Sequence, residues 1–246
     1  MLSDQVKEGL LSFVGYGRPS APIWFVGAEE GLGGAMTEDD ERANQLARGK
    51  WQEFMDLCEA HKTLKEDGKE IDIRKKRKGS STVWLWMSRI ARAYERHGDW
   101  EDKELAREFM QTRLGRLNGK TFDNAGREQL QTFLTELSPV PEKKTGEPRW
   151  FGELRTGSLS QKLLAEREAR IKGLLRSEKP KVVICYGLGK RQQFSQLLNV
   201  VRWDEVAKKV FKAPNDNFFL LPFFGHGQKI REITQGLVSY PLFYEG

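Results

Sequence analysis

Two adjacent glutamates, Glu29 and Glu30, follow a short apolar run and precede a glycine-rich stretch, GLGG. When two carboxylates lie side by side, one can have a raised pKa while the other stays ionised, so the pair can divide general-base and structural work. Alternatively, one glutamate points to solvent or caps the helix that follows. The residue types therefore predict acid–base chemistry in this turn, and leave the division of roles open.

A histidine, His226, lies in another glycine-containing loop, PFFGHGQK. The three histidines lack the spacing of metal ligands, and the two cysteines, Cys58 and Cys185, are far apart in apolar surroundings. We therefore expect no metal, iron–sulfur cluster or disulfide framework. The segment GLGKR lacks the spacing of a dinucleotide or P-loop fingerprint, so we expect no nucleotide cofactor and no other cofactor.

Four short apolar runs are typical of strands that are buried on both faces. They are residues 22–26 (PIWFV), 132–137 (TFLTEL), 181–186 (KVVICY) and 217–221 (NFFLL). Helical patterns lie between them, and this alternation predicts an α/β fold with a parallel sheet. In such sheets ligands bind beyond the carboxyl ends of the strands, so the loops after these runs are the candidate site.

Three helices are expected between the strands. Thr37, followed by three acids, is a good N-cap, and apolar residues then recur at helical spacing as far as Cys58. A second helix is predicted to begin near residues 80–81 and to bury Trp84. A third, residues 160–176, is strongly charged.

The chain has 246 residues, which favours one domain over residues 1–246, and a net charge of +6, which permits a polyanionic partner. The N-terminal residues do not have the pattern of a signal peptide, and no stretch approaches the roughly 20 apolar residues of a membrane span. We expect a soluble, cytoplasmic monomer that does not bind membranes.

The four loops, in order, resemble the motifs of the uracil-DNA glycosylase superfamily. The first motif corresponds to GAEEG (27–31), the second to TELSPVP (135–141), and the last, a His-Pro-Ser-like loop, to His226-Gly227-Gln228. The resemblance covers most of the chain. It implies a single-domain three-layer sandwich with a central four-stranded parallel sheet flanked by helices.

The resemblance implies hydrolysis of an N-glycosidic bond. In that reaction the sugar gains oxocarbenium character and the departing base gains negative charge. A carboxylate and a hydrogen-bond donor stabilise these charges, and Glu29 and His226 match the positions for those roles. Glu29 stands where the family often has an Asp or Asn that positions water, and Glu30 replaces the usual Pro. The catalytic candidates are thus Glu29, Glu30 and His226.

Two departures from the family motifs predict the base. The Tyr that blocks pyrimidine C5 in the thymine-rejecting branch is replaced by Gly31, which leaves room beside C5; alternatively, the glycines merely permit a tight turn. The base-reading Asn is replaced by Glu136, and an ionised carboxylate suits the N4 amine of cytosine. Alternatively, Glu136 pairs with a cation of the following loop. With Gly27, these residues form the predicted pocket.

A base in a duplex must be flipped out and held by stacking. The first aromatic residues after the first motif are Trp51 and Phe54, which are the candidates for this role. Each can equally be part of the core of an amphipathic helix. Trp150 or Phe223 can serve instead.

Phosphate contacts are expected at three places. The first is a basic run before a helix start, where free backbone N–H groups can also bind an anion, unless the run is simply a solvated surface. The second is the GLGKR loop, and the third follows His226. The residues are Arg74, Lys75, Lys76, Arg77, Lys78, Ser80, Ser81, Gly187, Gly189, Lys190, Lys229 and Arg231.

The expected function is that of a monofunctional DNA glycosylase. Its expected substrate is a C5-substituted cytosine, such as glucosylated hydroxymethylcytosine in phage DNA, and the product is an abasic site. This resembles antiviral members of the superfamily. The alternatives are a repair glycosylase for uracil or oxidised pyrimidines, and a DNA-binding module that has lost catalysis.

Overall fold

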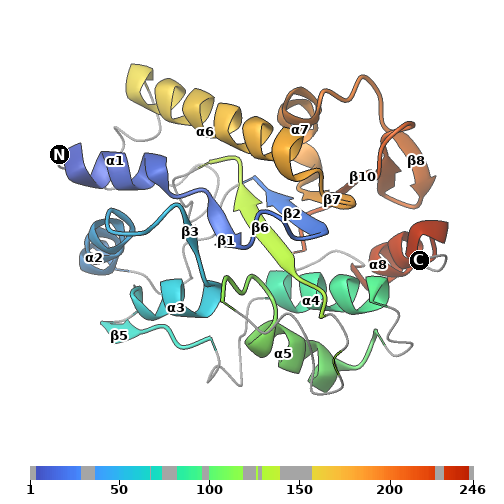
Figure 1. The fold of residues 1–246 in the computed structure, drawn as a ribbon, viewed down its shortest axis with the longest axis horizontal. Helices are drawn as coiled ribbons and strands as arrows, with labels where there is room; N and C mark the ends of the chain where they lie inside the picture. The colour runs from blue at the N-terminus through green and yellow to red at the C-terminus, as the bar shows by residue number, and fades with distance from the viewer. Residues whose placement is uncertain are drawn as a thin grey trace.

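The chain forms a mixed α/β structure in which a large, mostly parallel sheet lies between helices (Figure 1). The computed structural model describes residues 4–28, 37–66, 68–73, 82–95, 100–118, 126, 129–138, 157–224 and 230–243. The strand order is β3-β1-β6-β2-β7-β10-β9-β8. The strands are β1 (Gly15–Gly17), β2 (Ile23–Gly27), β3 (Phe54–Met55), β6 (Thr132–Glu136), β7 (Val182–Tyr186), β8 (Asp204–Ala207), β9 (Val210–Lys212) and β10 (Phe218–Leu221).

The four apolar runs form the centre of the sheet. They are β6, β2, β7 and β10, which are adjacent and parallel in that order. The expectation of an α/β fold with a sheet flanked by helices is confirmed, but the sheet has eight strands within the described residues alone, so the expectation of four is wrong. The added strands β3, β1, β9 and β8 are short and lie outside the apolar runs, which explains why periodicity missed them.

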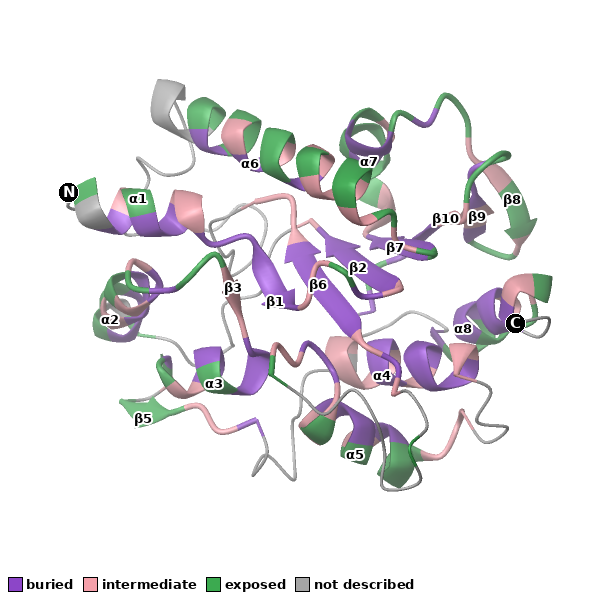
Figure 2. Ribbon diagram, viewed as in Figure 1, coloured by how far each residue is buried: buried purple, intermediate pink, exposed green. Residues whose placement is uncertain are grey.

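Helices cover both faces of the sheet, and side chains alternate between two cores as strand geometry requires. Phe25 and Ile184 point into one core, together with residues of α3, α4, α5 and α8; Trp24 and Val183 point into the other, with residues of α6 and α7. The helices are α1 (Asp4–Ser12), α2 (Glu38–Arg48), α3 (Leu57–Lys62), α4 (Thr82–Tyr94), α5 (Lys103–Thr112), α6 (Gly157–Glu178), α7 (Arg191–Leu198) and α8 (Ile230–Val238). Figure 2 shows the central strands as the most continuously buried part of the fold.

The first predicted helix is interrupted. Its N-cap is confirmed, because the Thr37 hydroxyl accepts a hydrogen bond from the Asp40 N–H (3.1 Å) and the Asp40 carboxylate accepts one from the Thr37 N–H (3.3 Å). However, α2 ends at Arg48, and the chain then forms β3 and α3. The break lies where α2 meets α1: a Cβ at Gly9 would lie 2.3 Å from the Gly49 Cα. The helices predicted near residues 80–81 and at 160–176 correspond to α4 and α6.

Short elements complete the fold. A two-stranded hairpin is formed by β4 (Lys65–Glu66) and β5 (Lys69–Glu70), and single 3-10 turns are η2 (Leu188–Lys190) and η3 (Pro241–Phe243). Within the described ranges, none of the helices combines the length and apolar character needed to cross a bilayer.

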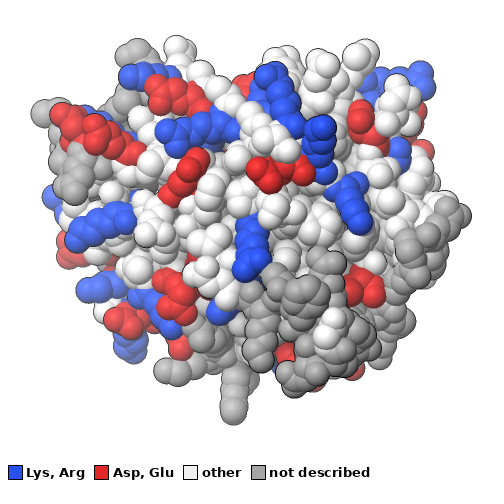
Figure 3. All heavy atoms as spheres, viewed as in Figure 1, with Lys and Arg blue, Asp and Glu red and all other residues white. Residues whose placement is uncertain are grey.

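Figure 3 shows one face of the molecule, where Lys and Arg side chains are interspersed with Asp and Glu side chains. Partly exposed ion pairs lie along α6, Lys172 with Glu168 at 2.6 Å and Lys162 with Glu166 at 3.7 Å. Exposed pairs of this kind contribute little to stability and largely cancel one another's field at a distance. The described residues of this face therefore do not form a patch of one sign.

Candidate functional site

The loops of the candidate site leave the sheet at the carboxyl ends of its parallel strands. Hydrogen bonds between β2 and β6 continue past the strands, from the Leu137 N–H to the Gly27 carbonyl and from the Ser138 N–H to the Ala28 carbonyl, both 2.9 Å. The Gly187 N–H likewise donates to the Leu221 carbonyl (2.8 Å). The strand order changes direction between β2 and β7, and ligands in open α/β sheets bind beyond the carboxyl ends at such a point.

Three residues form one row across these strand ends. In the sheet register Gly27 is the partner of Glu136 on one side and of Tyr186 on the other. The Tyr186 hydroxyl donates a hydrogen bond of 2.5 Å to Glu136 Oε1. A Cβ at Gly27 would lie 1.8 Å from Glu136 Oε2 and 2.3 Å from the Tyr186 hydroxyl oxygen. The contact between the two side chains therefore requires a glycine between them.

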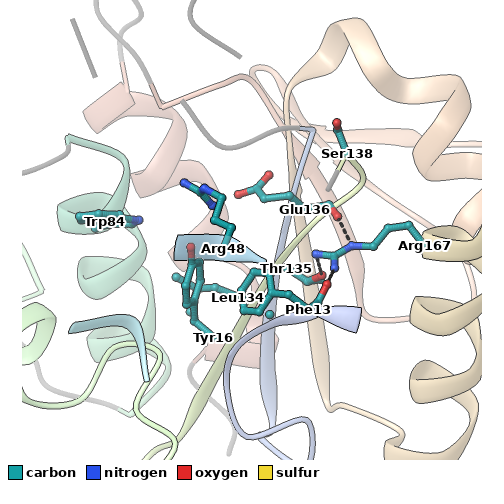
Figure 4. Close-up of a pocket in the computed structure, with 10 residues that line it drawn as sticks. Phe13, Tyr16, Arg48, Trp84, Leu134, Thr135, Glu136, Ser138 and Arg167 are labelled. Atoms are coloured by element: carbon teal, nitrogen blue, oxygen red, sulfur yellow. Dashed lines mark hydrogen bonds between the residues drawn. The ribbon is translucent and has the colours of Figure 1, made fainter. Parts of the chain in front are cut away.

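Glu136 also lines a pocket at the end of β6 (Figure 4). Aromatic, cationic and hydroxyl-bearing side chains surround it. The lining residues are Phe13, Gly15, Tyr16, Arg48, Trp84, Leu134, Thr135, Glu136, Ser138 and Arg167. The cavity is narrow, about 30 Å³, which is room for one or two water-sized groups.

Two arginines lie beside Glu136. Arg48, from the last turn of α2, points its guanidinium toward the Glu136 carboxylate in Figure 4 and lies over the Trp51 ring at 4.7 Å. Arg167 of α6 is buried; its Nε donates to the Glu136 carbonyl (3.0 Å) and one terminal nitrogen donates to the Val14 carbonyl (2.6 Å). Arg167 thus fixes the backbone at Glu136. The Glu136 carboxylate itself is a hydrogen-bond acceptor that a ligand can use.

The predicted stacking residues are packed in the two cores. Trp51 is 6% exposed, and its indole N–H donates to the Thr63 hydroxyl (3.0 Å). Phe54 packs against Phe133, with ring centroids 6.0 Å apart. Neither is among the described residues that line the pocket, whereas Trp84 is.

Another aromatic group lies at the end of β10, where Phe224 stacks on Tyr186 at 5.3 Å. Its neighbour Phe223 lies 6.2 Å from the Tyr186 ring and is 49% exposed. An exposed phenylalanine ring beside the row formed by Glu136, Gly27 and Tyr186 is available to stack on a ligand ring.

Four of the predicted phosphate contacts fall in the described residues. Gly187 has a φ of +119° and begins the turn of Gly189 and Lys190 that leads into α7; Gly189 is exposed and Lys190 is half-buried. This loop lies beside the first motif, since a Cβ at Gly187 would be 3.9 Å from the Ala28 Cβ. It is therefore adjacent to the candidate site.

The fourth, Arg231, binds a carboxylate. Its Nε donates to Glu101 Oε1 (3.0 Å) and a terminal nitrogen donates to Glu101 Oε2. These hydrogen bonds raise the pKa of Arg231 and lower the pKa of Glu101. Burial lowers the pKa of nearby Arg89, although Glu101 acts in the opposite direction. A phosphate at Arg231 would have to displace Glu101.

The remaining predicted site residues lie outside the described residues. They are Glu29, Glu30, Gly31, Arg74, Lys75, Lys76, Arg77, Lys78, Ser80, Ser81, His226 and Lys229. The meeting of Glu29 with His226 therefore stays a prediction.

Sequence reasoning missed Tyr186, Arg48 and Arg167. Tyr186 had a signal, because it is a polar-tipped residue at the carboxyl end of an apolar run. The two arginines had none: Arg167 is one of several charged residues in α6, and only the fold shows that it is buried.

Among the described residues, no group of three or more His, Cys, Asp and Glu side chains is placed to hold a metal ion. Neither a scan against protein-family models nor a search of curated proteins found a match to this chain.

Proposed function

We propose that this protein is a monofunctional, cofactor-free DNA glycosylase. It hydrolyses the N-glycosidic bond of a flipped-out, C5-substituted cytosine and leaves an abasic site. The observation that carries the proposal is the row of Glu136, Gly27 and Tyr186 at the carboxyl edge of the central strands. The parallel block of β6, β2, β7 and β10 between helices is compatible with the uracil-DNA glycosylase fold that the motifs resemble.

Glu136 is proposed to read the base. Its carboxylate accepts hydrogen bonds and cannot donate them when ionised, so it suits the N4 amine of a cytosine, whereas it offers no donor to the carbonyl oxygens of uracil. The cavity beside Glu136 is narrow, so the base ring would lie at its mouth, over the strand ends. Exposed Phe223 is proposed to stack on the ring there.

The bond-breaking roles are assigned to Glu29, Glu30 and His226. Ala28, which directly precedes Glu29, is hydrogen-bonded to Ser138, two residues after Glu136. Phe224, two residues before His226, stacks on Tyr186. The segments that carry the acid and the imidazole thus begin at Ala28 and Phe224, which contact the neighbourhood of Glu136 and Tyr186 respectively. A glutamate would activate water and stabilise the sugar cation, while His226 would stabilise the departing base.

DNA is proposed to bind along the same edge. The basic run of residues 74–78 leads into α4, whose Trp84 lines the pocket. The GLGKR loop, whose Gly187 lies beside Ala28, offers the exposed Gly189 and the half-buried Lys190. Both segments are suited to phosphate contacts that would hold the strand while a base is extruded. The protein is proposed to act as a cytoplasmic monomer, with modified phage DNA as the substrate.

The test is base release from one set of oligonucleotides. They carry uracil, hydroxymethyluracil, hydroxymethylcytosine or its glucosylated form, and alkali cleaves the strand wherever a base has been removed. We expect release of a modified cytosine, and Glu29→Gln should retain DNA binding while losing at least about a hundredfold in rate. Preferred release of uracil would indicate a repair enzyme. Salt-dependent binding without any abasic product would indicate a binding module.

A further inference from the structure

The hydrogen bond between Tyr186 and Glu136 spans an intervening strand. Neighbouring strands lie about 4.8 Å apart, so β6 and β7 are separated by about 10 Å across β2. Two long side chains can bridge this distance only if the residue between them leaves the space above the sheet empty. Gly27 does so, since a Cβ there would overlap both polar groups.

The Tyr186 hydroxyl is held in place. Tyr186 is 2% exposed, and its ring stacks on Phe224 with an interplanar angle of 22°. The backbone carbonyl of Glu136 is separately bound by Arg167. Glu136 is therefore fixed at its main chain by one residue and at its carboxylate by another, which is the arrangement that a specific recognition group needs.

We propose that Tyr186 is a specificity-determining residue that fixes Glu136 as a hydrogen-bond acceptor and so selects an amine-bearing base edge. This inference rests on the proposed function. A hydroxyl that donates to a carboxylate stabilises its ionised form, and an ionised carboxylate accepts only. A carboxyl that protonates more easily also donates, and then tolerates the imide edge of a uracil-type base.

Other polar and charged groups surround the same carboxylate. Among the described residues, Arg48 of α2 points toward it, and the side chains of Tyr16, Ser138 and Arg167 share its pocket. Arg48 favours the ionised form in the same way as Tyr186. Removal of the Tyr186 hydroxyl is therefore expected to weaken base discrimination and not to abolish it.

The test compares Tyr186→Phe with Tyr94→Phe, which removes a hydroxyl from a half-buried tyrosine on α4 that is outside the site. The ratio of kcat/KM for hydroxymethylcytosine to that for hydroxymethyluracil is measured from mildly acidic to mildly alkaline pH. In Tyr186→Phe the ratio should fall about tenfold or more, the scale of one hydrogen bond to a charged group. As the pH is lowered, the activity of Tyr186→Phe on the cytosine substrate should also be lost at a higher pH than that of the parent, because the Glu136 carboxylate would protonate more easily. Tyr94→Phe should match the parent.

Gly27→Ala is a second variant, because it keeps both polar groups but drives them apart. It should show the same loss of preference. Parental base preference and pH profile in Tyr186→Phe would overturn the inference, whatever Gly27→Ala does.

Failure of the proposed function would look different, since the parent protein would then release no base. In that case the positioning role of Tyr186 is tested by the titration of the Glu136 carboxylate, which is followed by carbon NMR. The signal of this carboxylate is assigned by its loss in Glu136→Gln. A titration that moves to higher pH in Tyr186→Phe supports the positioning role, and an unchanged titration overturns it.

Discussion

The Arg167 Nε donates a 3.0 Å hydrogen bond to the backbone carbonyl of Glu136, and this contact ties α6 to the carboxyl end of β6. The same guanidinium binds the backbone carbonyls of Phe13 and Val14, just before β1. One buried cation thus joins a helix, the end of a central strand and the segment before β1. The position of the proposed base-reading carboxylate depends on it.

Arg167→Met should lower the free energy of unfolding by about 3 kcal/mol, because buried carbonyls lose charged donors. Urea denaturation followed by circular dichroism measures this. Arg170→Met is the control: Arg170 lies on the same helix but is exposed, and its loss should cost less than about 0.5 kcal/mol. Equal effects of the two substitutions would contradict the role assigned to Arg167.

Glu136→Gln should shift base preference from cytosine-type to uracil-type substrates. An amide offers both a donor and an acceptor, whereas the carboxylate only accepts, and one such pair discriminates by roughly 1–3 kcal/mol. Competitive cleavage of mixed oligonucleotides gives the ratio directly. Glu70→Gln, at an exposed position on β5, removes the same charge and should leave the ratio unchanged. If both variants keep the parental preference, Glu136 does not read the base.

Phe223 and Phe224 are neighbours whose substitution should affect different properties. Phe223→Ala should weaken binding of DNA that carries the substrate base about tenfold or more, the scale of one stacking contact, with little change in stability. Phe224 is fully buried against Tyr186, so Phe224→Ala should instead destabilise the fold by about 3–5 kcal/mol. Fluorescence anisotropy and urea denaturation separate the two effects. Normal DNA affinity in Phe223→Ala would exclude it as the stacking residue.

Glu101→Gln should strengthen DNA binding. The Glu101 carboxylate binds the guanidinium of Arg231, and a neutral glutamine at this position would leave Arg231 available to a phosphate. The plot of log affinity against log salt should become steeper by about one unit. Glu104→Gln is a suitable comparison, because Glu104 pairs with Arg107 on the same exposed stretch of chain. If the two variants bind DNA alike, Arg231 makes no phosphate contact.

Both cysteines should resist thiol reagents in the folded protein. Cys58 and Cys185 are buried, and burial raises the pKa of the Cys185 thiol well above its ordinary value. Since the thiolate is the reactive form, Ellman's reagent should react quickly only after unfolding in urea, and should then detect two thiols. A fast-reacting thiol in the native protein would show that the fold opens locally around that cysteine.

The centre of the sheet was predictable because its strands are buried on both faces and therefore read as continuous apolar runs. The short strands β1 and β3 at one side of the sheet were not predictable: β1 is only Gly15–Gly17, and β3 is only two residues long. The end of α2 depends on its close approach to α1 at Gly9, a contact that periodicity does not encode.

The candidate site was predictable in part. Glu136 was found because it lies near the end of an apolar run, residues 132–137, at the position of a motif. Its partner Tyr186 lies 50 residues away in sequence, and only the strand register brings the two together above Gly27. Which aromatic ring is exposed likewise depends on packing, as the contrast between buried Trp51 and half-exposed Phe223 shows.

The five-residue strand β2 is paired on both sides, so it sets the alignment of two neighbours at once. Insertion or deletion of a single residue within it would turn Gly27 to the opposite face and set a residue with a Cβ between Glu136 and Tyr186. At the far edge, the β8–β9 hairpin already contains an irregularity between Glu205 and Ala207. A change in chain length is therefore tolerable in the β8–β9 hairpin, whereas in β2 it would break the contact between Glu136 and Tyr186.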